Sequence, residues 1–438
     1  MKLTSFLKNS VWAFTDKGIQ ALFGVFLAIY ILRELPSDEA ALFINLQVIF
    51  LTFSNIVHGM ALGPMVKFYS EDTTKHNFVL ASFALNLIGF VVGTILLVVL
   101  TPILSSILQL PKLIDLMYLA IIISFFSLIK NFVSEIYRAK NVIWIYSIIN
   151  IIQQLSSLVA LLWISFEIGL ESAEQVAFVI LGGVLTGLTV TFFILLFRGS
   201  FKAIKEMSLG FSEELKKIWD FGKYTSLSIT LQHVYDKVDI LMITSLLGVQ
   251  EVVLYYAVIN FKKVYDLMKQ IIHILFFSTM SKLWYEKKVE ELRDFFEKII
   301  FSTTSVLIVG SVFLFFSADF LFDVLYKNKF PEGANMLRIF TFYALVLSWN
   351  TTGEALLLAL NKPKSLLAVR VFSSILNVIM NYFLISYFGV LGAILSTLIA
   401  ITIVSIIYAY QSKKEIGFTF IGVLGRYKDS MNLLRNRR

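Results

Sequence analysis

The chain has 438 residues, of which 58% are hydrophobic and 16% charged, and its formal net charge at pH 7 is +8. A soluble chain of this length would need a more polar surface, so we expect a protein that crosses a membrane many times. The absence of cysteine excludes disulfides, thiol catalysis and cysteine metal sites, and the four histidines show no metal-ligand spacing, so we expect no metal.

Twelve stretches of the sequence are apolar over a length that suits a membrane-spanning helix. About 30 Å of hydrocarbon requires about 20 mostly apolar residues in a helix. The predicted spans lie near 10–32, 40–62, 78–100, 115–136, 143–166, 176–197, 222–245, 252–280, 299–317, 335–360, 367–385 and 390–410. The fold class that follows is an all-α integral membrane protein with twelve transmembrane helices.

The distribution of Lys and Arg between the spans predicts the topology. If the N-terminus is cytoplasmic, the segments on that side carry 25 Lys and Arg, and the external loops carry 4. Positive residues are enriched in cytoplasmic loops. We therefore predict that both termini are cytoplasmic.

One predicted span contains an unusual number of charges. The stretch INFKKVYDLMKQIIH, at 259–273, holds three lysines, an aspartate and a histidine. One alternative treats 262–270 as a cytoplasmic loop. That reading removes one crossing and turns the basic segments that follow it outward, so we favour a charged membrane helix.

The charges of this helix fall largely on one side. At about 100° per residue, Tyr255, Lys262, Asp266, Lys269 and His273 form a stripe, with Lys263 on its flank. A charge facing lipid at mid-depth costs about 2.5–3.5 kcal/mol on the insertion scale. We therefore expect the stripe to face protein or water.

The preceding span, 222–245, carries a similar polar face. Asp236 and Asp239 lie on one side of it with Gln232 and His233, and Lys237 lies on the flank. One interpretation is a hydrated cavity in which lysines hold an anion and the carboxylates balance charge or carry a coupling ion. The alternative is static ion pairing of Asp236 or Asp239 with Lys262 or Lys263.

Weaker polar features occur in other spans. Asp16 and Lys17 lie in the first span, Glu354 in the tenth and Arg370 in the eleventh. We assign Lys17 and Arg370 to the candidate head-group site, together with the lysines above and His273, and we assign Asp16, Glu354 and Asp266 to counter-charge or ion coupling. Stripes of Ser and Asn in the fifth and eleventh spans are interpreted as contacts that hold membrane helices together.

The two halves of the chain repeat one another. PSDEAALFIN (36–45) resembles GVQEVVLYYA (248–257), PMVKFYSE (64–71) resembles TMSKLWYE (279–286), and SIINIIQQ (147–154) resembles SILNVIMN (374–381). The repeat predicts two pseudo-symmetric six-helix lobes at 1–200 and 222–410, a cytoplasmic linker at 201–221 and a basic cytoplasmic tail at 411–438. Such an architecture is typical of transporters with a substrate site in a central cleft.

At this point the chain resembles a known family. The twelve-helix plan, DKVDILMITSLLGVQEVVLYYAVINF (236–261) and YFGVLGAILST (387–397) are similar to polysaccharide flippases of the multidrug/oligosaccharidyl-lipid/polysaccharide (MOP) exporter superfamily, which have a MATE-like fold. The resemblance implies a flippase that moves an undecaprenyl-diphosphate-linked oligosaccharide across a bacterial inner membrane by alternating access. It also implies a basic cavity for the diphosphate-sugar head, in keeping with Lys262, Lys263 and Lys269.

Two other functions stay open. A multidrug cation antiporter of the same superfamily would need a cavity dominated by carboxylates, whereas here the charged helix has three lysines and one aspartate. An integral-membrane glycan polymerase or ligase would need a large external loop, and the longest predicted one, 318–334, is short. We expect no catalytic residue, no cofactor and no nucleic-acid partner; the expected partners are the lipid-linked oligosaccharide and membrane lipids, with H+ or Na+ and a loose association with polysaccharide assembly proteins as open possibilities.

Overall fold

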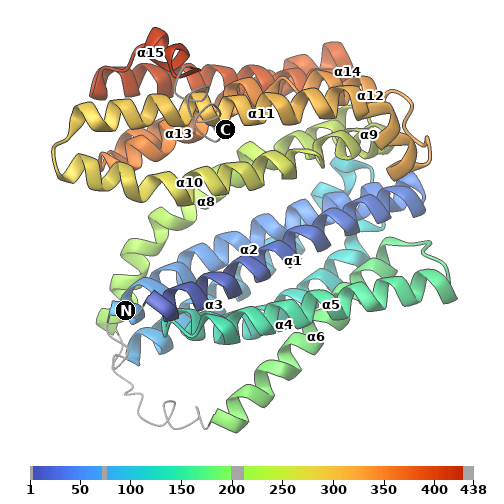
Figure 1. Cartoon of the computed structure of the whole chain (residues 1–438). Helices are drawn as coiled ribbons and strands as arrows, with labels where there is room; N and C mark the ends of the chain where they lie inside the picture. Colours follow the sequence, from blue (N-terminus) through green and yellow to red (C-terminus); the bar gives the residue numbers. More distant parts are fainter. Residues whose placement is uncertain (1–2, 72–75, 199–211, 428–438) are drawn as a thin grey trace. The chain divides into compact units, whose positions relative to one another are not determined.

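The computed structural model describes residues 3–71, 76–198 and 212–427, with the side chains of 3–10, 13, 198, 271–275 and 278 outside the description. Within these ranges every regular element is a helix, which confirms the all-α prediction (Figure 1). The helices are α1 (Leu3–Glu34), α2 (Ser37–Glu71), α3 (Asn77–Leu108), α4 (Leu113–Ala139), α5 (Ile143–Glu167), α6 (Ala173–Arg198), α8 (Ser212–Leu246), α9 (Val249–Ile259), α10 (Lys262–Tyr285), α11 (Val289–Tyr326), α12 (Gly333–Phe340), α13 (Tyr343–Ala359), α14 (Pro363–Ile416) and α15 (Phe420–Gly425). Parts of the predicted linker (201–211) and tail (428–438) lie outside the described residues.

Each predicted span coincides with helical backbone. In the described part of the chain, eight helices are long and apolar enough to cross a membrane: α1, α2, α3, α4, α5, α6, α11 and α14. The predicted span 252–280 is divided into α9 and α10, and 335–360 is divided into α12 and α13. The total of twelve spans and the side on which the termini lie stay predictions.

The helix divisions are tightened turns rather than chain reversals. Between α9 and α10 the amide of Lys263 donates to the carbonyl of Asn260 at 3.2 Å, and the amide of Val264 donates to that of Phe261 at 3.1 Å. These bonds join residues three apart, as in a 3₁₀ turn, which is common at helix ends. The charged helix therefore begins afresh at Lys262.

The two last predicted spans meet at a break inside α14. Gly389 has φ 60° and ψ −140°, and the backbone on either side is helical. Residues with a Cβ rarely adopt this conformation, so the glycine permits the chain to change direction there. The break divides α14 into two helical parts, which correspond to the predicted spans 367–385 and 390–410.

The chain divides into two compact units, which we call the first unit (Met1–Val253) and the second unit (Leu254–Arg438). In the first unit α5 packs against α1 and α6, and α2 packs against α3, α4 and α8. In the second unit α13 packs against α10, α11 and α14. The predicted second lobe starts at 222, whereas the second unit starts later, because α8 packs along α2.

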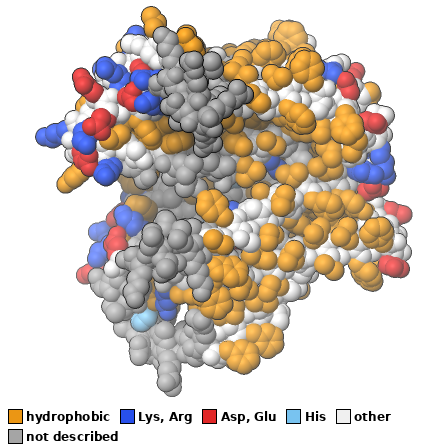
Figure 2. Space-filling view, in the orientation of Figure 1, with side chains coloured by type: hydrophobic (Ala, Val, Ile, Leu, Met, Phe, Trp, Pro, Cys, Tyr) orange, Lys and Arg blue, Asp and Glu red, His pale blue; other side chains and the backbone are white. Residues whose placement is uncertain are grey.

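The surface of the helices has the character expected of a membrane protein. Figure 2 shows hydrophobic side chains spread over the middle of the helices, with Lys, Arg, Asp and Glu gathered toward their ends. On α11, for example, Val309 is 71% exposed and Phe316 is 78% exposed. Exposed apolar surface on this scale would cause aggregation in water, whereas in a membrane it is in contact with lipid.

Candidate functional site

The second unit holds three of the predicted site residues in one cluster. The Glu354 carboxylate on α13 accepts a hydrogen bond from Nη2 of Arg370 on α14 at 2.7 Å. Nζ of Lys269 on α10 lies 3.4 Å from the other oxygen of the same carboxylate. Sequence analysis selected all three residues, but it did not predict that they meet.

The position of Glu354 follows from the packing of its helix. Eleven residues of α13, among them Thr351, Gly353 and Leu357, are buried, so α13 is the central helix of the second unit. A carboxylate in such a place is stable only with charged or hydrogen-bonding partners. The two cations outnumber the carboxylate, and the cluster carries a net charge of +1 when all three groups are ionised.

Three other charges of α10 lie at its start, and Lys282 lies in its last turn. Lys262, Lys263 and Asp266 are each partly buried and each takes part in polar interactions. Val264 and Leu267, which the helical periodicity places on the opposite arc, are exposed. The side chain of His273 lies outside the described residues.

Tyr265 shows how α10 is fixed within the second unit. Its ring is buried and packs against Phe340 and Tyr343. Its hydroxyl and that of Ser311 on α11 are 2.7 Å apart and share a hydrogen bond. These contacts fix the start of α10, where Lys262 and Lys263 lie, against α11, α12 and α13.

Several side chains on the polar face of α8 have hydrogen-bond partners in the first unit. Nε2 of Gln232 donates to Asp236 at 2.8 Å, and the His233 ring lies 2.7 Å from the Asn55 amide of α2. Asp239 is buried and accepts from the amide of Ile240 at 2.8 Å. Lys237 is partly buried and has polar partners.

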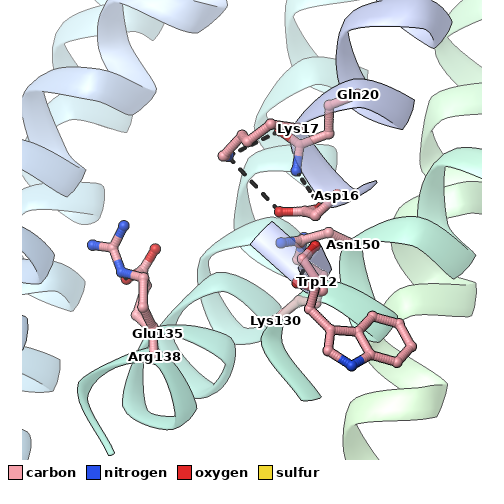
Figure 3. Close-up of polar contacts among 9 residues, drawn as sticks. Trp12, Asp16, Lys17, Gln20, Lys130, Glu135, Arg138 and Asn150 are labelled. Atoms are coloured by element: carbon pink, nitrogen blue, oxygen red, sulfur yellow. Dashed lines mark hydrogen bonds and ion pairs between the residues drawn. The ribbon is translucent and has the colours of Figure 1, made fainter. Parts of the chain in front are cut away.

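A second polar cluster lies in the first unit, around Asp16 (Figure 3). The Asp16 side chain is fully buried, and its carboxylate accepts from Nε2 of Gln20 at 2.7 Å. Lys17 lies 3.9 Å from the second carboxylate oxygen and is 57% exposed. Asp16 and Lys17 were both predicted site residues.

Sequence analysis missed the most buried cation of this cluster, Lys130. It lies on α4, is 4% exposed, and donates to the side-chain carbonyl oxygens of Asn150 at 3.0 Å and Gln153 at 2.6 Å. The signal was a single lysine inside the apolar stretch ISFFSLIKNFV (123–133). A lone charge forms no stripe, so helical periodicity did not select it.

The sequence profile of a family described as "Polysaccharide biosynthesis protein" matches residues 43–335, about two thirds of the chain. Two uncharacterized membrane proteins of Methanocaldococcus jannaschii are similar over shorter stretches. MJ1068 is 22% identical over 33% of this chain and 29% of its own length, and MJ1375 is 28% identical over 30% of this chain and 32% of its own length. The matched stretches thus span about a third of these relatives.

Two solved structures with a similar fold are a MATE family transporter and a lipid II flippase. An inward-facing multidrug resistance MATE family transporter of the MOP superfamily aligns with a TM-score of 0.76 at 14% identity, over 91% of this chain and 94% of that one. The lipid II flippase MurJ in an inward closed conformation aligns with a TM-score of 0.69 at 15% identity, over 98% and 91%. These likenesses confirm the predicted MATE-like fold.

Proposed function

The chain belongs to the polysaccharide biosynthesis protein family, and from this membership we propose that it is a flippase for a polyprenyl-diphosphate-linked oligosaccharide, of the undecaprenyl type in a bacterial inner membrane. In this proposal the protein works by alternating access and is a transporter, not an enzyme. The cargo is an anionic head group on a lipid tail.

The observation that carries the proposal is the charge on α10. A diphosphate leaves water only where cations replace part of its hydration. Lys262, Lys263 and Lys269 supply three ammonium groups on one helix of an otherwise apolar bundle. Asp266 is the one carboxylate of that helix's first turns, so the net charge favours an anion.

Within this proposal, Lys269 and Arg370 have different roles at the Glu354 cluster. Arg370 donates to Glu354 at 2.7 Å, whereas Lys269 lies farther away, at 3.4 Å, and both side chains are partly exposed. A phosphate oxygen can replace Glu354 as the partner of Lys269, while Arg370 continues to neutralise the carboxylate. In this proposal Lys269 binds the head group and Arg370 is a positioning residue.

Two alternatives predict other cargo or chemistry. A multidrug antiporter binds cations, which the lysines of α10 would repel; the likeness to a MATE transporter at 14% identity concerns the fold. A glycan polymerase or ligase would change covalent bonds in the oligosaccharide. The same assay distinguishes all three, because it follows both the position and the length of the glycan.

The test reconstitutes the protein in vesicles with a fluorescent polyprenyl-diphosphate oligosaccharide and measures how fast its head group becomes protected from an external quencher. Lys→Gln at 262, 263 and 269 should each lower the initial rate, and Lys→Arg should restore it, because Arg retains the charge. Lys282→Gln is the matched control: it lies on the same helix, is 74% exposed and pairs with Glu286.

Full flipping by all three Lys→Gln variants would refute the anion site, and a parent protein that does not flip the probe would refute the proposed function. A probe whose glycan becomes longer would favour the polymerase. Uptake of a cationic dye that Lys→Gln accelerates would favour the antiporter.

A further inference from the structure

Lys130 differs from the other membrane lysines in the kind of partner it has. Its ammonium donates to two neutral amide oxygens, those of Asn150 and Gln153. No described carboxylate lies within ion-pair distance of it. Lys269, by contrast, lies directly beside the carboxylate of Glu354. Lys130 is therefore a buried cation whose direct contacts do not neutralise it.

The side chain of Asn150 lies between Lys130 and the carboxylate of Asp16. Asn150 accepts a hydrogen bond from Lys130, and its side chain also lies beside Asp16, so it stands between the two charged groups (Figure 3). The Asp16 side chain is fully buried, and its neighbour Lys17 is exposed and lies 3.9 Å from one of its carboxylate oxygens. One oxygen of Asp16 has no hydrogen-bond partner in the described structure.

The helices that pack against α4 bring few other charges to this place. α3 has no ionisable residue, and α6 has them only at its ends, Glu174 and Arg198, and meets Lys130 through the small residue Gly187. The ionisable groups around Lys130 are Asp16 and Lys17 on α1, His58 on α2, Glu135 and Arg138 on α4, and Tyr146 on α5. Glu135 pairs closely with Arg138, at 2.6 Å, whereas Asp16 has only the exposed Lys17 at 3.9 Å, so we take Asp16 as the counter-charge of Lys130.

A lysine in this setting has two accessible forms. The amine accepts a proton to become the ammonium that Asn150 and Gln153 hold, and it loses one without breaking any contact to a carboxylate. Burying an ammonium among neutral groups costs free energy that burying the amine does not. A buried lysine can also release and rebind its proton, whereas arginine stays charged.

We propose that Lys130, with Asp16 as its fixed counter-charge, is a proton-exchange site that couples a proton gradient to transport. The inference rests on the proposed function. In one half of the cycle the N–H bond of the ammonium breaks and the proton passes to water on one side, leaving the amine. In the other half the amine takes a proton from water on the opposite side. The bound ammonium already provides the cation beside Asp16, so a sodium ion at this place would meet a like charge.

The test compares the parent with Lys130→Arg and Lys130→Gln in the vesicle assay, with and without an imposed pH gradient. The gradient should raise the initial flipping rate of the parent by about fivefold or more, because about fivefold is the smallest factor by which one coupled site typically affects another. It should not change the rate of either variant. Lys140→Arg, an exposed lysine at the end of the same helix, is the matched control and should keep the full stimulation.

A purely structural Lys130 predicts a different result, because arginine can also donate to Asn150 and Gln153. Gradient stimulation retained in Lys130→Arg would therefore overturn the proposal. So would a parent protein stimulated by a sodium gradient at equal pH on both sides.

A second measurement requires no cargo. Titration of the purified protein in detergent between neutral pH and about pH 9, where an ordinary lysine keeps its proton, should show one fewer exchangeable proton in folded Lys130→Arg than in the parent, and equal proton counts would refute the site. A parent that does not flip the probe would refute the flippase and leave this proton count as the test of Lys130.

Discussion

The Glu354 cluster permits a quantitative prediction for Glu354→Gln. Glutamine preserves the size of the side chain and a carbonyl acceptor, but it removes the charge that Arg370 and Lys269 share at 2.7 and 3.4 Å. At an effective dielectric constant of about 20, these separations correspond to attractions of roughly 6 and 5 kcal/mol. Most of the lost attraction is offset, because burying an uncharged glutamine costs less free energy than burying a carboxylate.

The net effect is set by what the two cations do next. Breaking a buried ion pair costs about 3–5 kcal/mol when the remaining charge stays buried. Here the side chains of Arg370 and Lys269 are 30% and 34% exposed, so both regain some water. We expect Glu354→Gln to lower the free energy of unfolding of the second unit by about 2–3 kcal/mol.

The assay is unfolding of the purified protein in detergent, followed by tryptophan fluorescence. Trp349, whose ring lies 5.6 Å from that of Phe418, reports on the core of the second unit. Arg370→Gln combined with Glu354→Gln should cost less than the sum of the single changes, by about 1–2 kcal/mol, because the two residues are in contact. Asp319→Asn, which breaks a pair between the exposed Asp319 and Arg338, is the control and should cost less than about 1 kcal/mol. Equal unfolding of Glu354→Gln and the parent, or strict additivity in the double variant, would refute this reasoning.

Three further predictions follow from the packing. Gly222→Ala should destabilise the contact between α8 and α2 by about 1–3 kcal/mol, because a Cβ there would overlap the backbone of Met60; Gly18→Ala, with nothing within 4 Å, is the control, and equal thermal midpoints for the two variants would contradict the prediction. Glu39 beside Lys112 raises the pKa of Lys112 above its usual 10.5. The pair therefore stabilises the fold below pH 10.5, and this stabilisation is lost as the pH rises through the raised pKa. The difference in thermal midpoint between the parent and Lys112→Gln should be constant near neutrality and vanish in strong alkali. Glu297→Ala should release α15, because the buried Glu297 accepts from the amide of Thr419 at 3.1 Å and from Arg426 at 2.8 Å; faster trypsin cleavage after Arg426 would confirm this, and an unchanged rate would refute it.

The helices of this protein could be predicted from sequence because lipid makes hydropathy a local property. A span has to be apolar along its own length, and its backbone bonds close within itself. For this reason the stretches near 78–100 and 143–166 coincide with α3 and α5, and Lys269, Glu354 and Arg370 could be selected as charges that do not face lipid.

Only the tertiary structure decided which charges meet. Lys269 pairs with Glu354, a contact that the sequence did not suggest. Glu354 and Lys269 are 85 positions apart in the chain, and their contact depends on how α10 and α13 pack. Periodicity gives the face of a helix but not the helix that lies opposite.

Lys130 marks the same limit from the other side. In the sequence it is one charge in an apolar stretch, and its partners Asn150 and Gln153 look like the small polar residues that hold membrane helices together. Packing of α4 against α5 and α6 buries its ammonium, and packing of α5 against α1 brings Asp16 to Asn150. The sequence determines that these residues lie inside the membrane helices, and three-dimensional packing alone determines that they form one network, because hydrogen bonds between helices depend on distances that no local pattern encodes.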